Sequence, residues 1–216
     1  MTILALDTTS QLGSLAIHRN GKTVAETTLH SSDGFAHLLF PAIERILAEG
    51  KVRLAEIDCF AAASGPGSFT GVRVGLSAVK GLAEATHKPA VGVSNLRALS
   101  SFGKSPFRAA ILDARRGEVY AGVYNATLEP VLPETVLPLQ AWLERLDPAH
   151  EYEFIRQSGS SIELPGPHVI EAPQALAPAI ALCAGLDRCR NGWLDPALLD
   201  ANYVRRSDAE LFWKDA

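Results

Sequence analysis

The sequence predicts an α/β protein of two lobes. Both halves of the 216-residue chain open in the same way, with a strand, a tight polar turn and a second strand, over 3–15 around Asp7 and over 109–123 around Asp113. An apolar strand, a glycine-rich turn and a helical pattern follow one another between residues 57 and 85. Alternation of strands and helices is typical of α/β folds, and the repeated opening indicates a duplicated unit.

The overall composition is that of an ordinary globular protein, because 47% of the residues are hydrophobic and 20% are charged. The formal net charge is −4, so no basic excess is visible in the totals. Neutralising phosphates supplies most non-specific affinity for nucleic acid. If the protein acts on nucleic acid, we therefore expect another subunit to make most of the contact.

The cysteines Cys59, Cys183 and Cys189 form no Cys-x-x-Cys pair, and their odd number is typical of a reducing cytoplasm. The chain starts with a strand-like segment that lacks the basic region and cleavage site of a signal peptide. No apolar run approaches the ~18 residues needed to span a bilayer. We expect a cytoplasmic protein that makes no contact with a membrane, with its cysteines packed in the core.

Residues 1–104 are predicted to form the N-terminal lobe, which carries the glycine loop. Asn20-Gly21 is a strong hairpin signal between two strands. The expected elements are strands over 3–7, 14–18 and 24–29, a helix over 35–49, a strand over 57–63, a helix over 70–85, a strand over 90–93 and a helix over 95–101.

Local signals set the expected helix ends in this lobe. Ser32 or Asp33 is available to cap the helix over 35–49, and Ser94 could cap the helix over 95–101. Pro41 falls inside the first of these helices, so we expect a kink or a later start there.

Residues 105–216 are predicted to form the C-terminal lobe, and Lys104-Ser105-Pro106 is the best candidate boundary. Its last helical segment could return to the first lobe. Pro130, Pro133 and Pro138 indicate a looser region after the opening hairpin. The expected elements are strands over 109–113 and 118–124, a helix over 142–146, a strand over 154–157, a helix over 176–189, and an extended segment over 202–206 before a last helical turn.

The run from Ser64 to Leu76 reads SGPGSFTGVRVGL and is the most informative stretch of the chain. A strand, a glycine-rich turn and a helix point backbone N–H groups at an anion. However, Val72 stands where a Walker loop needs lysine, and Thr70 where a dinucleotide motif needs glycine. The loop therefore resembles a phosphate-binding loop that lacks the lysine or glycine needed to hold the phosphate. Its candidate residues are Ser64, Gly65, Pro66, Gly67, Ser68, Thr70 and Arg73.

Asp7 and Asp113 both end an opening strand, and two interpretations of them stay open. In the actin, Hsp70 and sugar-kinase superfamily, acidic residues at such positions flank the nucleotide phosphates and their metal. Neither turn here shows the Asp-x-Gly pattern that lets the backbone approach phosphates. The two aspartates either cap their turns or form a vestigial nucleotide site.

The sequence lacks the common motifs of hydrolytic enzymes. The sequence contains neither Gly-x-Ser-x-Gly nor His-Glu-x-x-His, and no two of the six histidines lie four residues apart. Ser68 and Thr70 lack a base nearby in the sequence. We therefore predict no catalytic residue, no metal site and no cofactor.

Two helices carry more apolar surface than contact with one sheet face requires. The helix after the glycine loop also has a face of glycine and alanine, although each interior glycine costs roughly 1 kcal/mol relative to alanine. A second protein could cover both surfaces. The expected interface residues are Phe35, Leu38, Leu39, Ala42, Ile43, Ile46, Gly71, Val74, Gly75, Ala78 and Leu82. Leu39→Glu or Gly75→Arg should then abolish pairing and leave the fold intact.

Three segments together resemble the bacterial TsaB family, also called YeaZ. They are Leu4-Ala5-Leu6-Asp7-Thr8-Thr9, the run from Ser64 to Gly75, and the late Tyr203-Val204-Arg205. The resemblance runs in order along nearly the whole chain, and the central motif is the specific one. It implies an actin-like, Hsp70-like (ASKHA) fold of two lobes, each a mixed sheet flanked by helices.

The resemblance also implies a function in tRNA modification. Members of the family are non-catalytic partners of TsaD, a paralogue that transfers the threonylcarbamoyl group to form N6-threonylcarbamoyladenosine (t6A) at position 37 of tRNAs reading A-starting codons. The ATPase TsaE joins the assembly, and tRNA is reached only through the complex. Family members pair through the two helices after strand three and the glycine loop, as homodimers alone and as heterodimers with TsaD. The paired metal histidines of TsaD have no equivalent here, because the region offers only His37.

Two other functions remain as alternatives. A self-sufficient ATP-dependent enzyme of the sugar-kinase type would bind ATP–Mg²⁺ tightly and lose turnover on Asp7→Asn. A metalloprotease would hold a stoichiometric metal ion.

Overall fold

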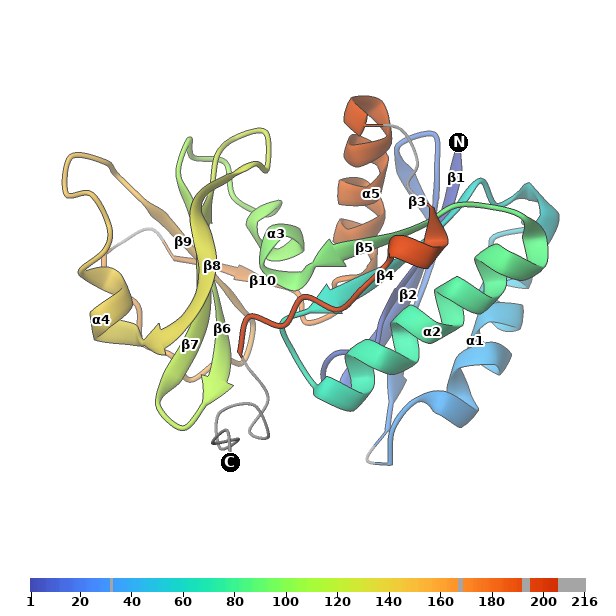
Figure 1. Cartoon of the computed structure of the whole chain (residues 1–216), viewed down its shortest axis with the longest axis horizontal. Coiled ribbons are helices and arrows are strands. Elements are labelled where there is room, and N and C mark those ends of the chain that lie inside the picture. The colour runs from blue at the N-terminus through green and yellow to red at the C-terminus, as the bar shows by residue number, and fades with distance from the viewer. Residues whose placement is uncertain (32, 167–168, 192–194, 206–216) are drawn as a thin grey trace, which may run out of the picture.

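The computed structural model describes residues 1–31, 33–166, 169–191 and 195–205. These residues form two five-stranded sheets with helices between them and on their outer faces (Figure 1). The sequence predictions for Ser32, for Arg206 and the last helical turn, and for the side chain of Cys189 lie outside the described residues.

The first sheet has the strand order β3-β2-β1-β4-β5. Its first three strands form an antiparallel meander, whereas β4 and β5 run parallel to β1. β1 is the central strand and is buried along its whole length, as expected for an apolar segment with neighbours on both sides. The strands are β1 (Thr2–Asp7), β2 (Leu12–Arg19), β3 (Lys22–His30), β4 (Cys59–Gly65) and β5 (Ala90–Ser94).

The second sheet repeats this topology, with the order β8-β7-β6-β9-β10. β6, β7 and β8 are antiparallel, and β9 and β10 run parallel to β6. The duplication confirms the predicted fold of two lobes, each a mixed sheet flanked by helices. The domain boundary at residue 104 stays a prediction. The strands are β6 (Arg108–Arg115), β7 (Glu118–Tyr124), β8 (Pro130–Pro138), β9 (Glu153–Gln157) and β10 (Val169–Ala172).

Two helices cover the outer face of the first sheet, α1 (Ala36–Glu49) and α2 (Phe69–Thr86) (Figure 1). α2 begins at its N-cap Ser68 and ends at His87, whose left-handed conformation closes the last turn. α1 begins within one residue of the predicted start, but Asp33 does not cap it: Phe35 is the N-cap, without a side-chain cap bond. Phe35 is buried and its ring lies against Gly13, so packing holds the helix start. α1 also continues through Pro41 instead of starting later.

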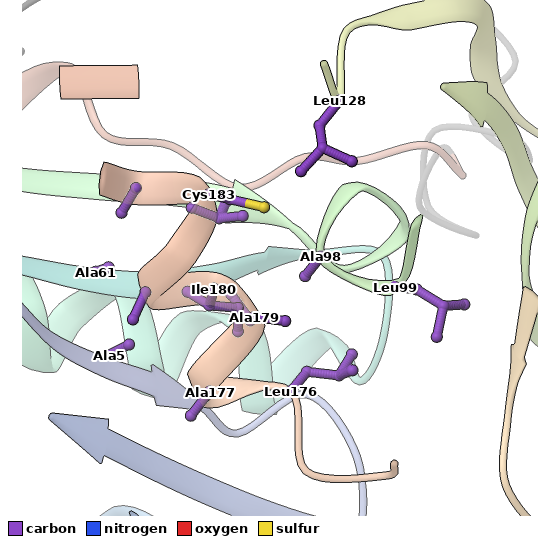
Figure 2. Close-up of a cluster of buried hydrophobic side chains, with 14 of the residues drawn as sticks. Ala5, Ala61, Ala98, Leu99, Leu128, Leu176, Ala177, Ala179, Ile180 and Cys183 are labelled. Atoms are coloured by element: carbon purple, nitrogen blue, oxygen red, sulfur yellow. The ribbon is translucent and has the colours of Figure 1, made fainter. Parts of the chain in front are cut away.

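Two further helices lie between the sheets, α3 (Asn95–Ser100) and α5 (Ala177–Asn191). α3 follows the first sheet but packs against β6 and β7, and α5 follows the second sheet but packs against β1 and β2. Figure 2 shows their small side chains in the shared core. Arg97 on α3 also forms an ion pair with Asp187 on α5, with 2.7 Å between nitrogen and oxygen. Ser94 caps α3, as predicted.

The outer face of the second sheet is covered by α4 (Leu139–Leu143), whose Trp142 is fully buried. The helix predicted over 142–146 therefore starts and ends three residues earlier. β8 and β10 were missed, since the prolines of β8 indicated a loop. β8 is an edge strand, where proline is tolerated because no ladder bond is needed on the outer side. Short 3₁₀ helices occupy Leu54–Glu56 and Pro196–Leu198.

No helix in the described part of the chain combines the length and the apolarity needed to cross a bilayer.

Candidate functional site

A cleft of about 840 Å³ lies between the two lobes. The first lobe contributes the β1–β2 turn and the glycine loop. The second lobe contributes the β6–β7 turn and the segment after β9. Hydroxyl and amide side chains make up much of the wall, and they include Thr8, Thr9, Ser10, Gln11, Thr70, Asn95, Ser158, Ser160 and Gln174.

Asp7 lies at the end of β1, beneath this cleft, and it is buried. Its Oδ1 accepts hydrogen bonds from the Thr9 backbone N–H at 2.9 Å and from the Thr9 hydroxyl at 2.6 Å. Burial raises the pKa of this carboxyl, and the hydrogen bonds from Thr9 and Asn95 oppose the rise. These contacts confirm that Asp7 caps its turn; a role in a vestigial nucleotide site stays a prediction.

The buried carboxyl of Asp7 predicts a specific pH dependence of stability. Because the pKa is higher in the folded state than in the unfolded chain, the folded state binds the proton more tightly. The contribution of Asp7 to the free energy of unfolding is complete at pH values below the pKa that this carboxyl has in the unfolded chain. It is lost as the pH rises through the higher pKa of the folded state. We expect Asp7→Asn to flatten this fall in the free energy of unfolding, measured by urea denaturation across the acid range. Asp113→Asn is the control for loss of one acidic charge, and an unchanged slope in Asp7→Asn would contradict the prediction.

Asp113 occupies the equivalent turn of the second lobe but is exposed. Its Oδ1 accepts the Arg115 backbone N–H at 2.7 Å, and its other oxygen lies 3.3 Å from the Arg115 guanidinium. Arg115, Arg116 and Gly117 all have positive φ, so this hairpin depends on the cap and on the glycine. Among the described residues, no group of three or more His, Cys, Asp and Glu side chains is placed to hold a metal ion.

The glycine loop is closed by the β1–β2 turn. The Ser68 backbone N–H donates to the Thr9 carbonyl at 2.7 Å, and the Ser68 hydroxyl accepts the Gly71 N–H at 3.2 Å. The Thr8 hydroxyl donates to the Gly71 carbonyl at 2.7 Å. Protein groups therefore satisfy N–H donors that a phosphate cradle would leave for its ligand.

The remaining residues of the glycine loop divide between core and surface. Ser64, Gly65 and Pro66 are buried, and the Gly65 N–H donates to Asn95 Oδ1 at 3.1 Å. Asn95 in turn donates to the Thr9 hydroxyl at 2.8 Å and so connects the loop to the Asp7 turn. Gly67, Thr70 and Arg73 are exposed. Asn95 was not among the predicted site residues, because its role depends on a contact 86 positions away.

The chain itself buries most of the predicted interface residues, and their role in pairing stays a prediction. Leu38 and Val74 remain partly exposed. Gly71 and Gly75 face Thr8 of the same chain, since a Cβ on either would lie within 2.7 Å of a Thr8 oxygen. Leu39→Glu and Gly75→Arg would thus damage the fold itself. The buried members are Phe35, Leu39, Ala42, Ile43, Ile46, Gly71, Gly75, Ala78 and Leu82.

Two of the cysteines, Cys59 and Cys183, are buried, as predicted. Burial raises the pKa of the Cys59 thiol to about 12, so it stays protonated and unreactive at neutral pH.

Comparison with known proteins agrees with the fold and the motifs. The family model described as TsaD, tRNA N6-adenosine threonylcarbamoyltransferase, matches residues 28–183, which is more than half of the chain. The solved structure of YeaZ from Pseudomonas aeruginosa is similar with a TM-score of 0.76 and 28% identity, over 94% of this chain and 99% of that one.

Two curated relatives carry the name tRNA threonylcarbamoyladenosine biosynthesis protein TsaB. The protein of Bacillus subtilis (strain 168) is 35% identical over 151 residues, which cover 68% of this chain and 66% of that protein. The protein of Escherichia coli (strain K12) is 37% identical over 130 residues, which cover 58% of this chain and 55% of that protein. The matches thus span between about half and two thirds of these relatives. The chain belongs to the family that the TsaD model describes, and its curated relatives and its solved structural match are TsaB (YeaZ) proteins.

Proposed function

We propose that this chain is a non-catalytic scaffold subunit of the complex that forms t6A at position 37 of tRNAs reading A-starting codons. In this proposal it binds and activates a TsaD-like paralogue, works with a TsaE-like ATPase, and forms homodimers when alone. The similarity to the TsaD model and to TsaB proteins supports a function in t6A formation. The observation that carries the non-catalytic role is the closed glycine loop, in which Thr8 and Thr9 already occupy donors and acceptors at the start of α2.

The exposed sides of α1 and α2 are the surface proposed for pairing. Phe40 on α1 is 53% exposed, which is unusual for a phenylalanine on a helix of the core. Leu38 and Leu47 on α1 and Val74 on α2 are partly exposed. Gly81 on α2 is exposed and has open space around it, so a partner could approach the helix backbone closely there. Aromatic side chains that fill a pocket of the partner typically contribute much of the binding energy.

The direct test mixes the purified chain with a TsaD-like paralogue, a TsaE-like ATPase, tRNA and threonylcarbamoyl-adenylate. We expect no t6A formation by the chain alone and t6A formation by the mixture. Phe40→Glu and Gly81→Arg should each reduce co-elution with the paralogue at least about 10-fold, because they place a charge or bulk on the proposed surface. The melting temperature should stay within a few degrees, since both sites are exposed.

Val131→Glu is the matched control, because Val131 is 50% exposed but lies on β8 of the other lobe. Full co-elution of Phe40→Glu and Gly81→Arg would show that the pairing surface lies elsewhere. Tight ATP–Mg²⁺ binding by the chain alone in calorimetry, with turnover lost in Asp7→Asn, would favour the ATP-dependent enzyme instead.

A further inference from the structure

A hollow of about 380 Å³ lies beside the glycine loop and adjoins the interlobe cleft, with which it shares Pro66, Gly67 and Tyr120. Phe69 at the start of α2, Tyr120 on β7 and Tyr203 near the end of the described chain supply three aromatic rings to its wall. Phe69 and Tyr203 are each 49% exposed, and their ring centroids lie 5.8 Å apart. The Asn202 backbone N–H donates to the Ser64 carbonyl at 2.7 Å, which fixes the late segment against the loop.

An arginine stacks at the rim of this hollow. The Arg73 guanidinium carbon lies 3.6 Å from the centre of the Phe69 ring, and its Nε donates to the Tyr203 hydroxyl at 3.1 Å. Among the ion pairs between described residues, none neutralises Arg73. The tyrosine thus holds the guanidinium in one orientation, while its terminal nitrogens stay available to an anion.

A second arginine repeats the arrangement on the other side. The Arg205 guanidinium carbon lies 5.7 Å from the centre of the Tyr120 ring, and Arg205 also forms an ion pair with Glu118. Arg116 completes the wall. Arg116 and Arg205 thus line the hollow, Arg73 lies at its rim on Phe69, and Glu118 pairs with Arg205.

We propose that this hollow binds an unpaired nucleobase of RNA together with its phosphate. Exposed aromatic rings and arginine planes are the groups on which unstacked bases stack, and the terminal guanidinium nitrogens of Arg73 suit a phosphate oxygen. The inference rests on the proposed function, in which the complex handles a tRNA. Since the chain as a whole is acidic, the hollow supplies one local contact and another subunit supplies most of the affinity.

The test measures RNA binding by the reconstituted complex and by the chain alone at low salt. The probes are an unmodified tRNA transcript reading an A-starting codon, a short single-stranded RNA, and the paired duplex of the same sequence. Arg73→Ala and Tyr203→Ala should each weaken binding of the tRNA and the single strand about 10-fold, the size expected for one lost stacking contact. The duplex should bind more weakly and respond less, because its bases are paired.

Three comparisons separate stacking from general charge. Tyr203→Phe keeps the ring and should retain most of the binding, whereas Arg73→Lys keeps the charge, loses the planar stack and should not. Arg53→Ala removes one exposed charge on a remote turn and should change nothing, since the Arg53 side chain is 84% exposed. Ultraviolet cross-linking should join the single strand to peptides that contain residues 69–73 and 203–205.

Unchanged RNA binding in both Arg73→Ala and Tyr203→Ala, or cross-links confined to other peptides, would overturn the inference. Unchanged RNA binding with lost co-elution of the paralogue or the ATPase would also overturn it, because the hollow would then be a protein contact. If the unsubstituted chain fails to associate with the paralogue, the proposed function is wrong. The measurements on the chain alone then still decide whether the hollow binds RNA.

Discussion

Gly71→Ala is expected to lower the free energy of unfolding by about 3 kcal/mol or more, since it places a methyl group inside the backbone of the Asp7 turn. An ideal Cβ at this position would lie 1.9 Å from the Thr8 carbonyl oxygen and 2.9 Å from the Thr8 carbonyl carbon. Backbone atoms cannot rotate away as a side chain can. Either α2 or the turn must therefore move, and the hydrogen bond from the Thr8 hydroxyl to the Gly71 carbonyl must distort with it.

Two other glycines of α2 provide matched controls. At Gly75 the nearest atom is the Thr8 hydroxyl oxygen, at 2.7 Å, so Gly75→Ala should cost less than Gly71→Ala. Removing that hydroxyl with Thr8→Ala should rescue Gly75→Ala but not Gly71→Ala, where the clash is with the Thr8 backbone. Gly81 has open space around it, so Gly81→Ala should be neutral or stabilise the protein by up to about 1 kcal/mol through helix propensity.

Urea denaturation of the single and double variants measures these differences as shifts in the transition midpoint at constant slope. Equal stability of Gly71→Ala and Gly81→Ala would show that the turn and the helix are not in close contact. Equal rescue of both glycine variants by Thr8→Ala would show that the Thr8 side chain, and not its backbone, limits how closely α2 can lie to the turn.

Glu134→Ala is expected to cost about 3 kcal/mol, because one carboxylate on β8 joins three segments that are far apart in the sequence. Its Oε1 accepts hydrogen bonds from the hydroxyls of Ser94 and Tyr124, and its Oε2 accepts the Asn202 side-chain amide at 2.6 Å. Ser94 caps α3 in the first lobe, and Tyr124 belongs to β7 in the second. Burial and the neighbouring Glu134 carboxylate raise the pKa of Tyr124, so its hydroxyl remains a donor.

Glu134→Gln keeps one acceptor oxygen and should cost less than Glu134→Ala, because the lost charge weakens the bonds without removing all of them. Glu144→Ala removes an exposed glutamate just after α4 and should change stability little. The measurement is again the free energy of unfolding in urea. A cost for Glu134→Ala no larger than that of Glu144→Ala would contradict the role of Glu134 as a link between lobes.

The architecture could be predicted from local patterns. β1, the Asn20-Gly21 hairpin and the glycine-rich turn before α2 each carry their signal within about ten residues, because side-chain periodicity and turn chemistry act over that range. Because these signals act only over such short distances in the sequence, β8 and β10 were not predicted. Proline in β8 has the same local meaning in a loop and in an edge strand, and only the neighbouring strand distinguishes the two.

The direction in which a helix face points could not be predicted in this way. The apolar and glycine positions of α1 and α2 indicated excess surface, and the sequence pattern is the same whether a partner or the chain's own sheet covers it. Contacts between residues far apart in the sequence show that the chain itself covers the glycine face of α2, because Gly71 and Gly75 approach Thr8. The chain's pattern of turns and apolar residues was thus sufficient to predict two α/β lobes, and the resemblance of three motif segments indicated the family. The closed loop, the Glu134 link and the aromatic–arginine hollow arise only when the folded backbone brings distant residues together.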